Sequence, residues 1–496
     1  MAETTIVFMV GLVGVVLTQG LSLVVKIIMA RRLGLDAFGV INIALMVLSL
    51  GVLVGELGLC DALTRNVAHA AGEGDARAIP VIEGAGLWLG LAGSLAIAVA
   101  LWVLAAPIAN RVFRDPRLAG LLAVLAWSLP AVAIADILAS VQRGLGRMWV
   151  PQLLVNALRV GLFALALSLI STERVTPWLV AWLYVGTAAV PACLLLTFFF
   201  ARRQQTFGTI RPAVPKLLGL GLPLLAAGLV TGPVVNQCMP LLLAAERSST
   251  EVGLFSAAWT FQSLMFLPVW VISLPGLALW SRMIGESDAH GQVVSFDFAG
   301  RWSLALTALA SLLFIAMPAL MLRTVFGEAF VSAGPALQVF GWGTIIASVA
   351  GPLGVVMMAR GQAARIFAIA AVSATIALLT TLLLVKRMGA MGVAIGYSTM
   401  NSVSVGLSVL SADTSVRVTL FSTTYRSFVA CVALAFAATL GCARLIVRAD
   451  LWGAAMTVAV FLVGLILSLG VVRPFGPVDR ALAHAILGAI RRRWPA

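Results

Sequence analysis

Two polar stripes run through otherwise apolar segments in the first third of the chain, and each stripe ends in a cation. Spacings of three or four residues place the members of each stripe on one face of a helix. The stripes, which lie in segments 5–29 and 150–171, consist of Gln19, Ser22 and Lys26, and of Gln152, Asn156 and Arg159. A cation deep in a membrane costs about 3 kcal/mol or more, so we expect both stripes to line a hydrated, positively charged cavity. Phosphate is an anion that Lys and Arg side chains hold well.

Each cation also has a structural interpretation. Lys26 lies about one turn from the end of its segment and could extend its ammonium group to the membrane surface. Arg159 lies nearer the middle of its segment, and Asp136 is a candidate ion-pair partner for either cation. Glu56 stands at the end of another apolar segment, where a boundary carboxylate and a proton carrier are both possible. Asp136 and Glu56 are therefore coupling or ion-pair candidates.

The second half of the chain carries amides where the first half carries cations. The corresponding polar positions are Asn236, Gln237 and Gln262. Amides inside a membrane hold helices together, and they can also line a path for sugar hydroxyls. We expect these three to line the same cavity, while anion binding is expected mainly in the first half.

Composition sets the fold class. Of 496 residues, 61% are apolar and only 10% are charged, against about 25% charged in soluble domains. Long apolar runs without period-two alternation predict helices rather than a barrel. The expected fold is an all-α polytopic membrane protein with about 14 transmembrane helices. No loop is long enough for an extramembrane catalytic domain, so we expect no enzyme.

Cysteines and basic residues point to no cofactor or nucleic acid. The five cysteines stand singly, and no Cys or His pattern indicates a metal or a redox pair. The formal charge of +14 comes from arginines scattered through short loops, where they fix topology and contact anionic lipid headgroups. We therefore predict no cofactor, no metal and no nucleic-acid partner.

Three landmarks recur at nearly constant spacing. The motif that begins at Ala37 returns 214 residues later at Glu251, Arg143-Gly144 returns 217 residues later at Arg360-Gly361, and Phe113 and Trp127 return at Phe326 and Trp342. This spacing predicts two pseudo-symmetric six-helix lobes around a central cavity, an arrangement used by many transporters. The predicted parts are a first lobe 1–200, a linker 201–216, a second lobe 217–411, two appended helices in 412–472 and a basic amphipathic tail 473–496. An excess of arginine on the side of the termini predicts that both termini are cytoplasmic.

Several motifs resemble those of polysaccharide (O-antigen-type) lipid-linked flippases, part of a superfamily of multidrug, oligosaccharidyl-lipid and polysaccharide exporters. The resemblance covers most of 5–411 and rests on 30–40 with 55–59, 143–147, 251–258, 326–330 and 386–394. It implies two lobes around a cavity that alternates between membrane faces of the bacterial inner membrane. The implied cargo is an undecaprenyl-pyrophosphate-linked oligosaccharide for exopolysaccharide assembly, with its pyrophosphate held by Lys26 and Arg159. Membrane lipids and the polysaccharide polymerase or export machinery are the implied partners.

One departure and two alternatives accompany this resemblance. Family members often carry an Asp-Arg pair in the seventh helix, where this chain has Cys238-Met239-Pro240. Coupling through an acid in the second lobe is therefore in doubt. A cation-coupled multidrug exporter of the same architecture would favour buried carboxylates, whereas the deep ionisable groups here are more basic than acidic. A peptidoglycan lipid II flippase is the other alternative.

Overall fold

The described part of the chain is helical throughout. The computed structural model describes residues 2–75, 77–201, 213–231, 237–412, 417, 419–445 and 450–472, which form helices and no β-strand. The predicted all-α class is confirmed. Asn236, residues 202–212 of the predicted linker and the predicted tail 473–496 lie outside the described residues. The helices form two compact units, Met1–Ser256 and Ala257–Ala496.

The predicted number of membrane spans is not confirmed by the described residues. Within the described residues, 11 helices are long and apolar enough to cross a membrane, or 12 if one bent pair counts as a single span. The predicted 14 transmembrane helices are therefore not confirmed as a count. The multi-span membrane architecture itself is confirmed, and the predicted lobe boundaries and the cavity between the lobes stay predictions.

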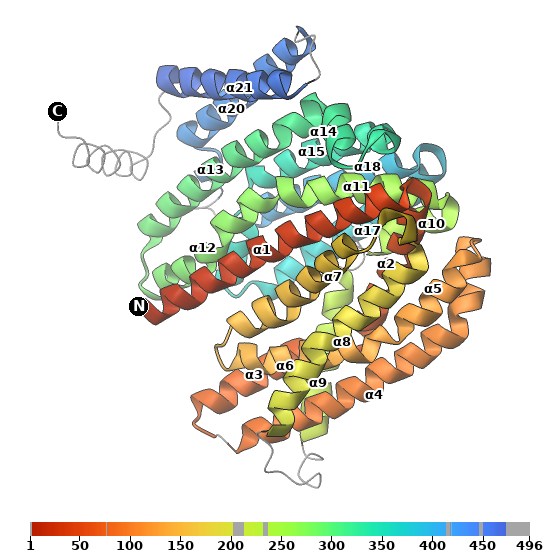
Figure 1. The fold of residues 1–496 in the computed structure, drawn as a ribbon. Coiled ribbons are helices and arrows are strands. Elements are labelled where there is room, and N and C mark those ends of the chain that lie inside the picture. The colour runs from red at the N-terminus through yellow and green to blue at the C-terminus, as the bar shows by residue number, and fades with distance from the viewer. Residues whose placement is uncertain are drawn as a thin grey trace, which may run out of the picture. The chain divides into compact units, whose positions relative to one another are not determined.

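The first unit contains the longest described helix and the cation-bearing segments. Its elements are α1 (Ala2–Leu33), α2 (Leu35–Gly55), α3 (Leu59–Gly72), α4 (Ala78–Pro107), η1 (Ile108–Phe113), α5 (Arg117–Ala126), α6 (Ser128–Gly144), η2 (Val150–Ala157), α7 (Leu158–Leu169), η3 (Thr172–Arg174), α8 (Pro177–Ala201), α9 (Ala213–Thr231), α10 (Met239–Glu246) and the start of α11 (Ser249–Met265). Helix α1 packs on η2 and α7, and α6 packs on α3, α4 and α8 (Figure 1). The cations of α1 and α7 are therefore on neighbouring helices.

The second unit continues from α11. It contains α12 (Leu267–Gly285), α13 (Ala289–Ala316), α14 (Pro318–Val325), η6 (Glu328–Ala333), α15 (Gly334–Val349), α16 (Leu353–Ala359), α17 (Ala363–Met388), α18 (Ala390–Ser411), α20 (Thr423–Leu445) and α21 (Leu451–Val472). Helix α15 packs between α13 and α18, and α17 packs on α18. Helices α20 and α21 lie side by side (Figure 1). Phe428, Phe436 and Phe461 are buried where this pair meets α13.

Prolines decide where several long segments break. A proline has no N–H and its ring clashes with the carbonyl four residues earlier, so a helix ends near that position. Helix α5 ends at Ala126, four residues before Pro130, and α6 continues after a bend of 41°. Pro268, Pro318 and Pro352 stand in the same way at the junctions after α11, α13 and α15. By contrast, α9 continues through Pro223.

The two copies of the repeated motif pack against each other through their glycines. A Cβ atom added to Gly39 would lie inside contact distance of the Ser249 carbonyl oxygen, and one added to Gly253 would lie 2.5 Å from the Leu35 carbonyl oxygen. Ser249 precedes Gly253 by four residues, as Leu35 precedes Gly39, so the contact is reciprocal. Small residues allow this close approach between helices where no hydrophobic effect drives them together. The starts of α2 and α11 are therefore held backbone to backbone.

We predict that Gly39→Ala destabilises the protein, because the neighbouring backbone must move to admit the methyl group. Overpacking of this kind costs about 1–3 kcal/mol. The matched control is Gly186→Ala in α8, where an added Cβ meets nothing within 4 Å. Thermal unfolding of the purified protein in mild detergent should show a lower midpoint for Gly39→Ala than for Gly186→Ala. Equal midpoints would contradict the close contact.

Candidate functional site

The cations of the two stripes line one cavity in the first unit. A pocket of about 160 Å³ opens among α1, α2, α7 and α8, and both Lys26 and Arg159 border it together with Ser22. The remaining lining residues are Val25, Met29, Asn42, Leu45, Val160, Phe163, Tyr184 and Thr187. The structure thus brings together three of the residues selected from the sequence, and surrounds them with mainly apolar side chains.

Neither cation forms a direct ion pair with a carboxylate in the described part of the chain. No described carboxylate lies within 4.0 Å of Lys26 or Arg159, and both side chains are half-buried. The nearby Arg32 differs, since its guanidinium donates to the Ile170 carbonyl oxygen at 2.6 Å and to the Leu167 carbonyl oxygen at the end of α7. Because half-buried charges without partners are costly, the Lys26 and Arg159 pair forms a site that an anion would stabilise.

Three polar side chains of this pocket were not predicted. Asn42 donates to the Phe38 carbonyl oxygen at 2.6 Å, and Thr187 donates to the Leu183 carbonyl oxygen at 2.9 Å, so both donors are used within their own helices. Tyr184 packs edge-on against Phe163, with ring centroids 6.1 Å apart, and the described residues offer its hydroxyl no hydrogen-bond partner. The one feature of the sequence that could have drawn attention to Tyr184 is that the chain has only three tyrosines.

The other members of the stripes lie elsewhere. Gln19 is exposed, and the half-buried Gln152 and Asn156 do not border the pocket that Arg159 borders. Local structure explains why the second stripe does not stay on one face. Residues 150–157 form the π-helix η2, and the chain forms an α-helix only from Leu158. A π-helix bonds each residue to the fifth along instead of the fourth, so each turn holds more residues and the spacing of seven from Gln152 to Arg159 no longer keeps one face.

The amides of the second half do not share one environment. Gln262 is buried and its side-chain nitrogen donates to the Tyr397 hydroxyl oxygen at 2.6 Å, which joins α11 to α18. The side-chain oxygen of Gln237 is buried and unbonded among the residues described, and Asn236 lies outside them. Gln262 therefore matches the interpretation of amides as links between helices.

The two acidic candidates meet each other. The carboxyl groups of Glu56 and Asp136 are close enough to interact, and the charge of Arg143 reaches both. The Cys60 thiol donates to one Glu56 oxygen at 3.4 Å, while the other Glu56 oxygen is buried with no hydrogen bond to any described residue. The charge of Arg159 also acts on Asp136, which links this pair to the cation pocket.

A second polar cluster stands beside the glycine contact. The Arg117 guanidinium lies 2.5 Å from the Asp36 carboxylate and 2.7 Å from the Asp115 carboxylate, and the Ser249 hydroxyl donates to Asp36. These residues border a cavity of about 620 Å³. Because its charges are paired, this cluster holds the starts of α2, α5 and α11 together rather than offering a free charge to a ligand.

A match to a known protein family identifies the family of this chain. The sequence profile of the polysaccharide biosynthesis protein family matches residues 7–279, more than half of the chain. The chain belongs to this family. The family resemblance predicted from the motifs is therefore confirmed. A sequence search among curated proteins finds no match.

Solved structures share the fold of this family member. The lipid II flippase MurJ in an inward closed conformation is 13% identical, with a TM-score of 0.75 over 92% of this chain and 97% of that one. An inward-facing multidrug resistance MATE family transporter is 16% identical, with a TM-score of 0.65 over 82% and 96%. A MOP superfamily transporter from Pyrococcus furiosus, described as having a binding pocket of reverse polarity, is 17% identical with a TM-score of 0.57 over 84% and 96%. At these identities the similarity shows a common fold of membrane transporters.

The absence of a direct partner for Arg159 can be tested with a double-mutant cycle. We predict that Arg159→Gln and Asp136→Asn change the unfolding free energy with a coupling of about 0.5–1 kcal/mol, because the charge of Arg159 acts on Asp136 without a direct ion pair. Unfolding in mild detergent, measured for both single variants and the double variant, gives this coupling. A structural ion pair would instead make each single variant lose about 3–5 kcal/mol and the double variant recover much of that loss.

Proposed function

We propose that this protein is a flippase that moves an undecaprenyl-pyrophosphate-linked oligosaccharide from the cytoplasmic to the periplasmic leaflet by alternating access. The observation that carries the proposal is the pocket that Lys26 and Arg159 share without a carboxylate from the described chain. A pyrophosphate supplies the missing negative charge, and Arg offers it a planar set of donors while Lys offers a point charge. The family of the chain, named for polysaccharide biosynthesis, supports a glycan as the group attached to that phosphate.

The pocket holds only part of such a cargo. Its volume of about 160 Å³ suits a phosphate group rather than an oligosaccharide or a polyprenyl chain. The tail would stay in the bilayer and the sugars would occupy space beyond the pocket. Tyr184, with a hydroxyl that the described residues leave available, would add a neutral donor beside the two cations. In this proposal the protein lies in the bacterial inner membrane with cytoplasmic termini, and delivers its product to the polysaccharide polymerase or export machinery.

The same charges argue against a multidrug exporter. A cationic drug entering the pocket would meet Lys26 and Arg159, both of which repel it. Lipid II remains the competing cargo, because it presents the same pyrophosphate chemistry and differs in the attached sugars. Direct competition between the two lipids therefore separates the proposals.

We predict that Lys26→Gln and Arg159→Gln each weaken binding of a polyprenyl-pyrophosphate-linked oligosaccharide by about 10- to 100-fold, since a hydrogen bond to a charged group contributes about 1.5–3 kcal/mol. Native mass spectrometry of the purified protein measures the binding, with lipid II as competitor. The double variant should also abolish surface polysaccharide in cells that depend on this protein.

The control for this experiment is Arg174→Gln, which removes an exposed arginine outside the pocket. This variant should bind and export like the unchanged protein. Lys26→Arg, which keeps a positive charge in the pocket, should bind the lipid more tightly than Lys26→Gln does. Unchanged binding and normal glycan display in the double variant, with the protein present in the membrane, would overturn the phosphate-binding role. Preferential binding of lipid II would overturn the proposed cargo.

We also propose that Glu56 and Asp136 form the site through which a cation couples to transport. Two neighbouring carboxyl groups shielded from water favour holding one proton or one metal cation between them. Arg159 is close enough to Asp136 for its charge to act on it, so an anion bound at Arg159 would change how tightly that cation is held. Such a link needs no acid in the second half, where Cys238-Met239-Pro240 replaces the pair often found in the family.

We predict that Glu56→Gln and Asp136→Asn each abolish proton or sodium movement driven by cargo in liposomes. Cargo binding should remain within about three-fold of the unchanged protein, because both cations are kept. An internal pH- or sodium-sensitive dye follows the movement, and Asp61→Asn, at an exposed carboxylate on α3, serves as the control. Cation movement at the control rate in both variants would contradict the coupling role.

A further inference from the structure

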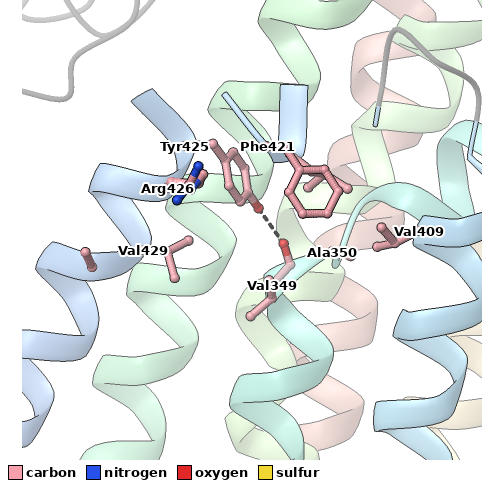
Figure 2. A pocket seen from close by; sticks show the side chains of 9 residues that line it. Val349, Ala350, Val409, Phe421, Tyr425, Arg426 and Val429 are labelled. Carbon is pink, nitrogen blue, oxygen red and sulfur yellow. Dashed lines mark hydrogen bonds between the residues drawn. The ribbon is translucent and has the colours of Figure 1, made fainter. Parts of the chain in front are cut away.

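An apolar pocket with one cation lies in the second unit, where the appended helix α20 begins. Its volume is about 410 Å³, and it lies among the end of α15, the end of α18 and the start of α20 (Figure 2). The lining consists of Val349, Ala350, Val409, Leu420, Phe421, Tyr425, Arg426, Val429 and Ala430. Seven of these nine side chains are aliphatic or aromatic hydrocarbons, so the pocket excludes a freely hydrated ligand.

The Tyr425 hydroxyl is already used. It donates to the Val349 carbonyl oxygen, which Figure 2 shows as a dashed line between α20 and the end of α15. This carbonyl has lost its helical partner, because α15 ends at Val349 and the Leu353 amide donates to Ala350 instead. Tyr425 is buried against α13, where a Cβ atom on Gly300 would lie 2.7 Å from its hydroxyl oxygen. The appended helix is therefore fastened to the break between α15 and α16.

Arg426, next along the chain, has no such role. Its side chain is exposed, and within the described chain no carboxylate or carbonyl oxygen binds its guanidinium. Other arginines of this region are engaged. Arg417 donates to the carbonyl oxygens of Leu410 and Ala412 at 2.6 and 3.0 Å, and Arg301 lies 2.6 Å from the Asp297 carboxylate. Arg426 thus offers a charge that the described residues leave unpaired at the edge of an apolar pocket.

The occupant must combine a hydrocarbon part with an anionic part. Apolar surface extends from the pocket, since Phe421 is 61% exposed and Leu410, next to the lining residue Val409, is 70% exposed. In a chain with 11 or more membrane-spanning helices, such surface faces lipid. A soluble anion would gain nothing from the apolar lining, and an uncharged lipid would gain nothing from Arg426. Anionic phospholipids of the bilayer carry both parts.

We propose that this pocket binds an anionic phospholipid, with its phosphate on Arg426 and an acyl chain along the pocket lined by α15, α18 and α20. The lipid would contact Val349 and Tyr425 directly, which are the two residues of the hydrogen bond between α20 and the end of α15. Bound lipid therefore stabilises the docking of the appended helix. This proposal requires only that the chain lies in a membrane, so it stands independently of the cargo.

The test measures thermal unfolding of the full-length chain in mild detergent, titrated with phosphatidylglycerol or with phosphatidylcholine. We expect phosphatidylglycerol to raise the unfolding midpoint more than phosphatidylcholine. Arg426→Gln should weaken that response by about 10- to 100-fold in lipid concentration, because a charged hydrogen bond is lost. Arg387→Gln, at an exposed arginine at the end of α17, is the matched control and should respond like the unchanged protein.

A second variant keeps the test decisive. Tyr425→Phe removes the hydrogen bond to Val349, so it should lower the midpoint without lipid while keeping the preference for phosphatidylglycerol. An equal response to both phospholipids, or an undiminished response of Arg426→Gln, would overturn the proposal. Tighter Arg426-dependent binding of undecaprenyl pyrophosphate than of phosphatidylglycerol would also overturn it, because the pocket would then hold the cargo lipid. An equal midpoint shift from inorganic phosphate would show that the apolar part is not recognised.

Discussion

The backbone contact between Gly39 and Gly253 is the constraint on which the first unit depends. It fixes the start of α2 against the start of α11, and the Asp36, Arg117 and Ser249 cluster can form only at that separation. Helix α2 also carries Asn42 into the wall of the cation pocket. Packing between small residues is a main source of helix association in lipid, so a methyl group added at this contact would force the starts of α2 and α11 apart.

The polar groups of the first unit follow a clear division. Arg117 and Arg32 are satisfied by carboxylates or helix-end carbonyl oxygens, whereas Lys26 and Arg159 share a pocket without such partners among the described residues. Structural arginines are therefore distinguished from ligand-binding cations by what surrounds them. The proximity of Arg159 to the Glu56 and Asp136 pair gives a short physical path by which an anion and a cation can affect each other.

Helical periodicity was enough to predict that Lys26, Ser22 and Arg159 could face one cavity, since cations are scarce in apolar segments and each one is informative. It was not enough for Gln152, because the π-helix η2 has more residues per turn and the spacing of seven to Arg159 no longer keeps one face. Tyr184 escaped prediction because one aromatic residue in an apolar helix has no distinguishing pattern. The pairing of Arg117 with Asp36 joins residues 81 positions apart, and no local pattern indicates it. Composition gave the fold class and the motifs gave the family, while the helix breaks after α5, α11, α13 and α15 depend on prolines that composition does not place.

The hydrogen bond from Tyr425 to Val349 joins the end of α15 to a helix outside the predicted repeat. Helices α20 and α21 follow the repeated block and have no predicted counterpart in it. The Val349 carbonyl group at the end of α15 accepts a hydrogen bond from Tyr425 on α20. Leaving a buried carbonyl group without a hydrogen bond costs about 1–3 kcal/mol. An element outside the predicted repeat therefore holds the end of α15, and a chain shortened before α20 would leave this carbonyl group without its donor.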